Sequence, residues 1–309
     1  MEFAGWSIEP PLAYVAVAGL LYWLGGRRMR SPQRPIRTAC FCAGLASIVV
    51  ALDSPIDGAA DKLFWAHMVQ HVILLTVSPP LILFGRPWPR MWRALPLGFR
   101  KKVGRGLVQS GIAAPLRALA RPLPAFILFN ASIALWHIPS LYNATLESNA
   151  IHQTEHAIFF FTGLLFWARV IDPGPLRPRL EWPMRIAYVT GAMVVGFAIG
   201  LTLVMVPHPL IAHYAGLAHR PGGLTALDDQ QIAGGVMWVP GSISYTIAAL
   251  IGFYRWLEPE AAAPVVSMNG SWNPRPSPEP VAPEAPKPRP VGSAEAEGPT
   301  PSTQPMLTT

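Results

Sequence analysis

The chain has 309 residues, of which 51% are hydrophobic and only 13% are charged, and its mean hydropathy is +0.32. Soluble domains carry about 25% charged residues, so this composition excludes an ordinary soluble domain. The net charge of +7 does not indicate nucleic-acid binding, because the basic residues lie in short connections between apolar blocks. We therefore expect an all-α polytopic membrane protein that contacts membrane lipid and no nucleic acid.

Seven apolar blocks approach or exceed the roughly 20 residues that cross a bilayer as a helix. The predicted spans are residues 8–25, 36–52, 63–85, 123–136, 151–171, 184–206 and 231–256. After them the chain is rich in Pro, Glu, Ala and Ser, a composition that cannot bury a core. We expect a seven-span membrane domain over residues 1–256 and a disordered, Pro-rich cytoplasmic tail over residues 257–309.

The basic residues fall in alternate connections. They gather between the first and second, the third and fourth, and the fifth and sixth predicted spans, whereas the other connections between spans contain only Lys62 and Arg220. By the positive-inside rule, the basic connections are cytoplasmic. This alternation predicts an N-terminus outside and a C-terminus in the cytoplasm.

Two of the predicted spans each contain a pair of histidines four residues apart. His67 and His71 lie near the outer end of the third span, and His152 and His156 near the outer end of the fifth. At 3.6 residues per turn each pair shares one helix face, and at 1.5 Å per residue His71 lies about 12 Å and His156 about 8 Å below these ends. Because polar side chains inside a membrane are costly and mark sites, we predict one shared site in the outer leaflet.

The other histidines also lie toward the predicted outer side. His137 follows the fourth span, where it is either a further ligand or a hydrogen-bonding partner of another helix. His208, His213 and His219 lie in the connection between the sixth and seventh spans. That position favours structural or incidental roles, and we keep His208 and His213 as weaker candidates.

Metal coordination is the chemistry that this arrangement favours. Neutral imidazole is the commonest protein ligand for metals and suits copper and zinc. Two helices that each supply an i, i+4 pair offer up to four nitrogens from rigid elements. Nearby polar groups that could hold the imidazoles in place are Gln70, Glu155, Asp229 and Gln230.

Three methionines offer thioether sulfur, a ligand that favours Cu(I). These are Met68, Met205 and Met237. Met68 directly follows His67, and adjacent positions on a helix point about 100° apart. Met68 therefore fits packing against lipid or core better than a place in the metal site.

Two other kinds of site stay open at this point. Residues 152–156 also read H-x-x-E-H, the inverted zinc-protease motif, in which Glu155 would act as general base of an intramembrane metallohydrolase. Alternatively, facing imidazoles on two spans could clamp a haem. The i, i+4 pairing matches a metal ion better than haem. The five-residue motif is a weak pattern by itself, and its usual context is a soluble or cleft-lining helix, so we expect a protein that is not an enzyme.

Prolines interrupt two of the predicted spans. Pro79 and Pro80 lie near the inner end of the third span, and Pro240 lies inside the seventh. Each removes a backbone donor, so we expect a kink and carbonyl groups that neighbouring helices must satisfy.

At these residues the sequence resembles the CtaG-type cytochrome c oxidase assembly factors of bacteria, the multispan kind associated with caa-type oxidases. The resemblance runs from about residue 53 to residue 256. It rests on DSPID at 53–57, HMVQH at 67–71, SPPLILFGRP at 78–87, WHIPSLY at 136–142, HQTEH at 152–156, GLLFW at 163–167 and DQQIAGGVMW at 229–238.

The resemblance implies a seven-span protein of the bacterial inner (plasma) membrane that helps to mature the oxidase. It implies copper as the cargo, a copper donor on the outer side, and the catalytic subunit of the oxidase as the recipient. The residues carried over by position are His67, His71, His137, His152, His156, Asp53 and Asp229. The segment VPHPLIAHYAG at 206–216 departs from the family pattern, which leaves His208 and His213 with the least support.

Overall fold

The protein is described here from a computed structural model that covers residues 10–29, 34–171, 173 and 180–258. These residues form helices and connections, with no strand among them. The first two residues of the predicted first span and residues 259–309 of the predicted tail lie outside the described part. The all-helical class is therefore confirmed for the described residues.

Each predicted span corresponds to helix in the structure. In chain order these helices are α1 (Pro10–Arg27), α2 (Pro35–Leu52), α4 (Phe64–Val72) continued by η1 (Ile73–Val77) and α5 (Ser78–Phe84), α9 (Pro122–Trp136), α11 (Asn149–Ile171), α12 (Trp182–Met205) and α14 (Ala226–Leu257). The shorter helices of the connections are α3 (Pro55–Ala60), α6 (Pro87–Ala94), α7 (Leu97–Gln109), α8 (Ala113–Leu119), α10 (Pro139–Glu147), α13 (Ala212–Ala215) and η2 (Pro221–Gly223).

Not every predicted span is long and apolar enough, as a helix of the described residues, to cross a membrane by itself. Among the described residues, five helical segments are long and apolar enough, and a sixth span results if α8 and α9, which meet at a 71° bend, count as one. Helix α9 has 15 residues, or about 22 Å at 1.5 Å per residue, against a hydrocarbon core of about 30 Å. Helix α1 ends in two glycines and Arg27, which lowers its hydropathy. The seven-span count and the orientation therefore stay predictions.

The helix of the third predicted span contains a π-helical segment, η1, directly before its two prolines. Over η1 the backbone widens by one residue, so that Ser78 N–H donates to the carbonyl of Ile73. Because Pro79 has no N–H, the carbonyl of Leu75 loses its usual partner, and Trp167 Nε1 on α11 donates to it at 2.9 Å. The expected satisfaction of a freed carbonyl by a neighbouring helix is thus confirmed. Helix α14, by contrast, runs through Pro240 as one helix.

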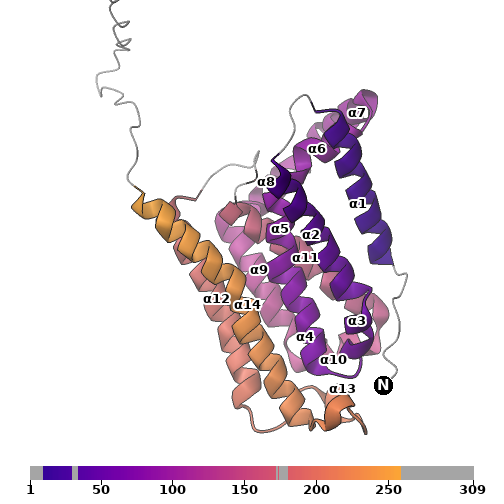
Figure 1. The fold of residues 1–309 in the computed structure, drawn as a ribbon, viewed down its shortest axis with the longest axis vertical. Helices are drawn as coiled ribbons and strands as arrows, with labels where there is room; N and C mark the ends of the chain where they lie inside the picture. The colour runs from indigo at the N-terminus through magenta and orange to yellow at the C-terminus, as the bar shows by residue number, and fades with distance from the viewer. Residues whose placement is uncertain (1–9, 30–33, 172, 174–179, 259–309) are drawn as a thin grey trace, which may run out of the picture. The chain divides into compact units, whose positions relative to one another are not determined.

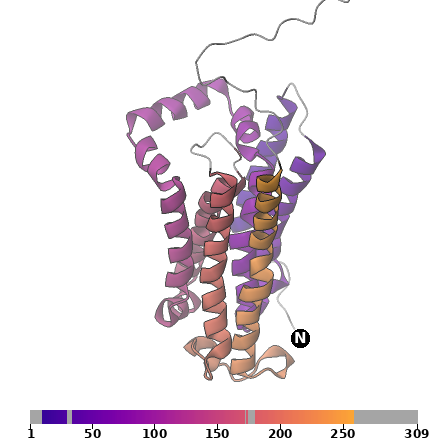
Figure 2. The same ribbon diagram turned by 90° about the vertical axis from the view of Figure 1, so that its left-hand side faces the viewer.

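Helices α12 and α14 run side by side in both views of the bundle (Figures 1 and 2). Two glycines permit this approach: a Cβ on Gly234 would lie 2.6 Å from the carbonyl oxygen of Gly200, and one on Gly200 would lie 2.9 Å from that of Gly234. Small residues at such crossings allow helix backbones to pack closely within a membrane. This pair fixes α14, which carries Asp229 and Gln230.

The two ends of the bundle differ in character. Helices α3, α4, α10 and α13 lie at one end, and the basic helices α6 and α7 lie at the other (Figure 1). Between them, aromatic side chains around the second half of α11 form the largest buried cluster, which includes Phe129, Phe166, Trp167, Tyr188 and Tyr245. The histidine pairs therefore lie in the half of the bundle away from the basic helices.

Candidate metal centre

The structure brings the two predicted histidine pairs together in the interior of the bundle. His67 and His71 project from α4, and His152 and His156 from α11. The ring centroids are 4.4 Å apart for His67–His71, 4.2 Å for His152–His156, 4.9 Å for His67–His152 and 5.6 Å for His71–His156. Residues that are about 85 positions apart in the sequence thus form one cluster, because the i, i+4 spacing places each pair on a single helix face.

Four side chains in this cluster have the geometry of a ligand set. One ligand atom from each of His67, His152, Glu155 and His156 can be chosen so that all four lie within 4.8 Å of one another. Ligands about 2.0–2.2 Å from a shared ion lie at most about 4.4 Å apart, so small side-chain rotations would complete a site. We refer to these four residues as the four-ligand cluster.

The polar atoms of the site are buried and lack partners. Among the described residues, the side-chain atoms without a hydrogen bond include Nε2 of His67, His137 and His152, both ring nitrogens of His71 and His156, and both carboxylate oxygens of Glu155. Leaving a buried polar group unsatisfied costs about 1–3 kcal/mol, and native structures contain few such groups. So many unpaired polar atoms in one place fit side chains that hold a ligand. Imidazole nitrogens and carboxylate oxygens are metal ligands, so this ligand fits a metal ion.

Tyr214 on α13 fixes the ring of His67. The hydroxyl of Tyr214 donates to the carbonyl of Ala60 at 2.6 Å, and His67 Nδ1 lies 3.0 Å from the hydroxyl oxygen of Tyr214. Burial raises the pKa of Tyr214 well above its ordinary value, so the phenol keeps its single proton and gives it to Ala60. His67 Nδ1 must then be the donor, which leaves Nε2 without a proton and free to bind a metal.

His137 shows the same arrangement at the end of α9. Its Nδ1 lies 2.7 Å from the carbonyl oxygen of Ile133, and a carbonyl can only accept, so Nδ1 carries the proton. Its Nε2 is buried and unpaired, and its ring centroid lies 6.0 Å from that of His71. His137 therefore joins the cluster from a third helix.

Asp229 supports the site through a helix end rather than through an imidazole. Its carboxylate oxygens accept hydrogen bonds from the backbone N–H groups of Phe64 at 2.9 Å and Trp65 at 3.0 Å. These are the first two residues of α4, so an acidic group from α14 caps the helix that carries His67 and His71. A negative charge at this position also matches the helix dipole.

The other predicted supporting residues likewise hold the surrounding backbone. Gln70 donates to the carbonyl of Ala51 and to Asp57 Oδ1, both at 2.8 Å, so it ties α4 to α2 and α3. Gln230 accepts from Leu210 N–H at 2.6 Å and donates to the carbonyls of Leu203 and His208. Asp53 is buried at the end of α2. Glu155 alone of the predicted supporting residues lies among the imidazoles.

The weaker candidates do not belong to the four-ligand cluster. His208 and His219 are exposed in the connection before α14, and His213 is half-buried with its backbone N–H bonded to Asn143 Oδ1. Met68 is fully buried in an apolar cluster with Phe64, Leu203 and Ile211, as its position on the helix predicts. Its side chain therefore packs within the apolar core.

Sequence reasoning missed two tyrosines that pack on the imidazoles. The ring of Tyr142, on α10, lies 5.2 Å from that of His67 and is fully buried. Tyr214 comes from a short helix in a connection that shows no pattern of its own. The sequence signal for Tyr142 is its place at the end of the WHIPSLY segment, five residues after His137, and Tyr214 has none beyond following His213.

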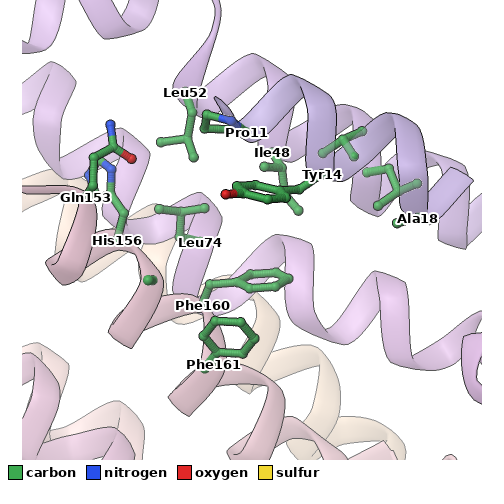
Figure 3. Close-up of a pocket in the computed structure, with 13 residues that line it drawn as sticks. Pro11, Tyr14, Ala18, Ile48, Leu52, Leu74, Gln153, His156, Phe160 and Phe161 are labelled. Atoms are coloured by element: carbon green, nitrogen blue, oxygen red, sulfur yellow. The ribbon is translucent and has the colours of Figure 1, made fainter. Parts of the chain in front are cut away.

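An apolar cavity of about 710 Å³ lies beside the site, between α1, α2 and α11 (Figure 3). Its walls include Ile48 and Phe160, and Gln153 and His156 lie together at one end. Tyr14 of α1, which also lines it, is 74% exposed. The cavity therefore connects the flank of the bundle with a residue of the four-ligand cluster.

Comparison with known proteins relates the chain to bacterial sequences. It is 27% identical over 220 residues to uncharacterized proteins of Mycobacterium bovis and Mycobacterium tuberculosis, a stretch that covers 68% of this chain and 32% of each relative. An uncharacterized protein of Mycobacterium leprae is 25% identical over 267 residues, covering 82% of this chain and 40% of the relative. The aligned stretch thus spans about a third of the length of these curated relatives. No solved structure matches the chain.

A family model described as cytochrome c oxidase caa3 assembly factor (Caa3_CtaG) matches residues 20–259. The matched region contains all the described helices from the end of α1 to α14, and with them every histidine of the site. Since the match extends over most of the chain, the protein belongs to the Caa3_CtaG family of cytochrome c oxidase assembly factors.

Proposed function

We propose that this chain binds copper at the four-ligand cluster and delivers it to the catalytic subunit of cytochrome c oxidase. The observation that carries the proposal is the convergence of His67, His152, Glu155 and His156. Their ligand atoms lie within 4.8 Å of one another, and each of these side chains has buried nitrogen or oxygen atoms without a hydrogen bond. Because the chain belongs to a family of oxidase assembly factors, we propose the oxidase as the recipient of the copper.

The ligand atoms of the site favour one oxidation state of the copper. Imidazole nitrogen suits copper in either oxidation state, whereas thioether sulfur selects Cu(I). Met68 packs within the apolar core and Met205 is 65% exposed, so neither adds sulfur to the site. Three nitrogens and one carboxylate favour a divalent ion, and we propose that the cargo is held as Cu(II).

The cavity beside His156 supports a sideways transfer. We propose that copper enters from a donor on the outer side, near the α10 and α13 end, and leaves through the cavity toward a membrane subunit docked at α1 and α11. The apolar lining of the cavity (Figure 3) suits contact with a partner inside the bilayer, where helices associate by packing.

Filling the cavity tests this route. Ala18→Trp, on the cavity wall, is expected to leave copper binding intact and to reduce oxidase assembly at least tenfold. Ala16→Trp places the same bulk on an exposed position of α1 outside the cavity and serves as the control. Full oxidase activity with Ala18→Trp would contradict the route.

The assembly function is tested in cells that depend on this chain for oxidase activity. His156→Ala is expected to abolish copper content in the purified protein and to lower the copper content and activity of the oxidase in the same cells. His219→Ala, in the exposed connection, is the matched control and should behave as the wild type. Normal, copper-loaded oxidase in cells with His156→Ala would overturn the proposal.

The two alternative site chemistries have less support from the geometry. In the inverted zinc-protease motif the glutamate is a general base and not a ligand, but Glu155 lies among the potential ligand atoms. Haem needs a flat slot between two imidazoles, whereas these rings pack on one another and on Tyr142 at centroid distances of 4.2–6.2 Å. A Soret band in the purified protein would support the haem alternative. A hydrolytic activity that is lost in Glu155→Gln would support the metallohydrolase alternative.

A further inference from the structure

Two of the five converging imidazoles lie outside the four-ligand cluster. His71 follows His67 by one helical turn, and His137 reaches in from the end of α9. Neither belongs to the set of ligand atoms that lie within 4.8 Å of one another. Both are nevertheless turned toward the same interior, because each ring packs against Tyr142 and Phe159, with centroid distances of 4.8–6.4 Å.

Glu155 connects these outlying rings with the cluster. Its Oε1 lies 3.7 Å from His71 Nε2, which is the separation of two ligands that share an ion at about 2.0–2.2 Å. His71 and His137 have ring centroids 6.0 Å apart. His67 and His156, both within the four-ligand cluster, have the same centroid distance of 6.0 Å, so this spacing is within reach of a common ion.

The number of orphan atoms exceeds what one ion can use. A tetrahedral ion takes four donors, one from each member of the four-ligand cluster. This leaves both nitrogens of His71, Nε2 of His137, the second oxygen of Glu155 and one ring nitrogen of His156 buried without a partner. Each unsatisfied buried group costs about 1–3 kcal/mol. A second ligand-binding position would use one nitrogen of His71, Nε2 of His137 and the second oxygen of Glu155. A carboxylate has two oxygens, and a glutamate can therefore serve two ions at once.

We propose that the site binds two metal ions, the second held by His71, His137 and the remaining oxygen of Glu155. This inference rests on the proposed function and extends it: the first ion is held by the four-ligand cluster, the second lies one helical turn further into the bundle, and Glu155 bridges them. Imidazole and carboxylate donors give the second position the same preference for a divalent transition metal. The chain would thus carry two ions for each transfer to its partner.

Metal counting tests the second position. The full-length protein is purified in detergent, stripped with a chelator, loaded with excess Cu(II) and desalted, and copper per chain is measured by mass spectrometry. We expect two ions in the wild type and one in the His71→Ala/His137→Ala variant. His208→Ala/His219→Ala, two exposed histidines outside the site, is the matched control and should keep two.

The outcomes separate this inference from the proposed function. One ion in the wild type, whether or not the His71→Ala/His137→Ala variant keeps it, overturns the second position and leaves copper binding standing. Two ions retained by that variant overturn the assignment of His71 and His137. No bound copper in the wild type overturns the proposed function itself. If the double variant does not purify as a folded protein, His71→Gln, which preserves bulk and polarity, is expected to give the same loss of one ion.

Discussion

The two halves of α11 lie in the same bundle and bury different kinds of side chain. In the second half, Phe166 stacks on Phe129 with centroids 4.3 Å apart and on Tyr188 at 4.6 Å, and Trp167 stacks on Tyr245 at 5.4 Å. The one buried indole N–H in this group is paired, because it donates to the carbonyl of Leu75. This half is organised for stability.

The first half of α11 buries its polar groups without partners. His156 and Glu155 are 4% and 0% exposed, yet none of their side-chain nitrogen or oxygen atoms has a hydrogen bond within the described chain. The second half buries aromatic rings with one unpaired hydroxyl, that of Tyr188, whereas the first half buries a carboxylate and imidazoles without partners. This difference supports the proposal that the first half binds a ligand, at a cost in stability.

The comparison predicts its largest effect for Trp167. Trp167→Ala removes a fully packed ring and leaves the Leu75 carbonyl without its donor, so we expect the free energy of unfolding to fall by about 3–5 kcal/mol. His156→Ala in the metal-free protein removes an unpaired polar group and is expected to change stability by less than about 1 kcal/mol. Unfolding of both variants in detergent, followed by circular dichroism, measures the difference. Equal destabilisation by the two substitutions would break the comparison.

A smaller effect is predicted for Asp229, which caps the helix α4 that carries His67 and His71. Asp229→Asn keeps the volume of the side chain but removes the negative charge of the carboxylate that accepts from the first two N–H groups of α4. We expect the free energy of unfolding to fall by about 1–2 kcal/mol. Because the cap positions His67 and His71, copper affinity should also fall by about 10- to 100-fold. Isothermal titration with Cu(II) checks the affinity.

The neighbouring acid provides the control for this prediction. Asp228 takes part in the cap of α14 itself. Its backbone N–H donates to the hydroxyl oxygen of Thr225, and its carboxylate accepts from the backbone N–H of Thr225. Asp228→Asn is expected to cost a few tenths of a kcal/mol and to leave copper affinity unchanged. If Asp228→Asn weakened copper binding as much as Asp229→Asn, the role assigned to the α4 cap would be wrong.

The smallest predicted effect belongs to the hydroxyl that orients His67. Tyr214→Phe keeps the ring packing but removes the oxygen that accepts from His67 Nδ1 and donates to Ala60, a loss of about 1 kcal/mol of stability. With its tautomer no longer fixed, His67 should bind copper about tenfold more weakly. Tyr254→Phe, on an exposed position of α14, serves as the control. An unchanged affinity in Tyr214→Phe would show that the hydroxyl does not orient the ligand.

The sequence predicted the parts of the site that depend on periodicity. The i, i+4 spacing of His67–His71 and His152–His156 places each pair on one helix face whatever the rest of the fold does, and hydropathy identifies the helices that carry them. That α4 and α11 are neighbours followed from the shared depth of the two pairs. Met68 was assigned to packing on the same geometric ground, and in the structure it is buried in an apolar cluster.

Contacts between distant elements could not be predicted in this way. Asp229 lies 165 positions from Phe64 along the chain, and no local pattern shows that it caps α4. Tyr214 reaches His67 only because a connection folds back over the bundle. The seven-span count depends on helices α1 and α9, whose terminal prolines, glycines and short length bring them close to the limit for crossing a membrane.

The central claim is that the polar half of α11 and the facing half of α4 form a metal centre. Copper content of the purified full-length protein, measured beside a variant with His67, His71, His152 and His156 changed to alanine, tests it most directly. We expect copper bound to the wild type and only background metal in the variant, with both proteins helical by circular dichroism. Equal copper in the two proteins would contradict the account.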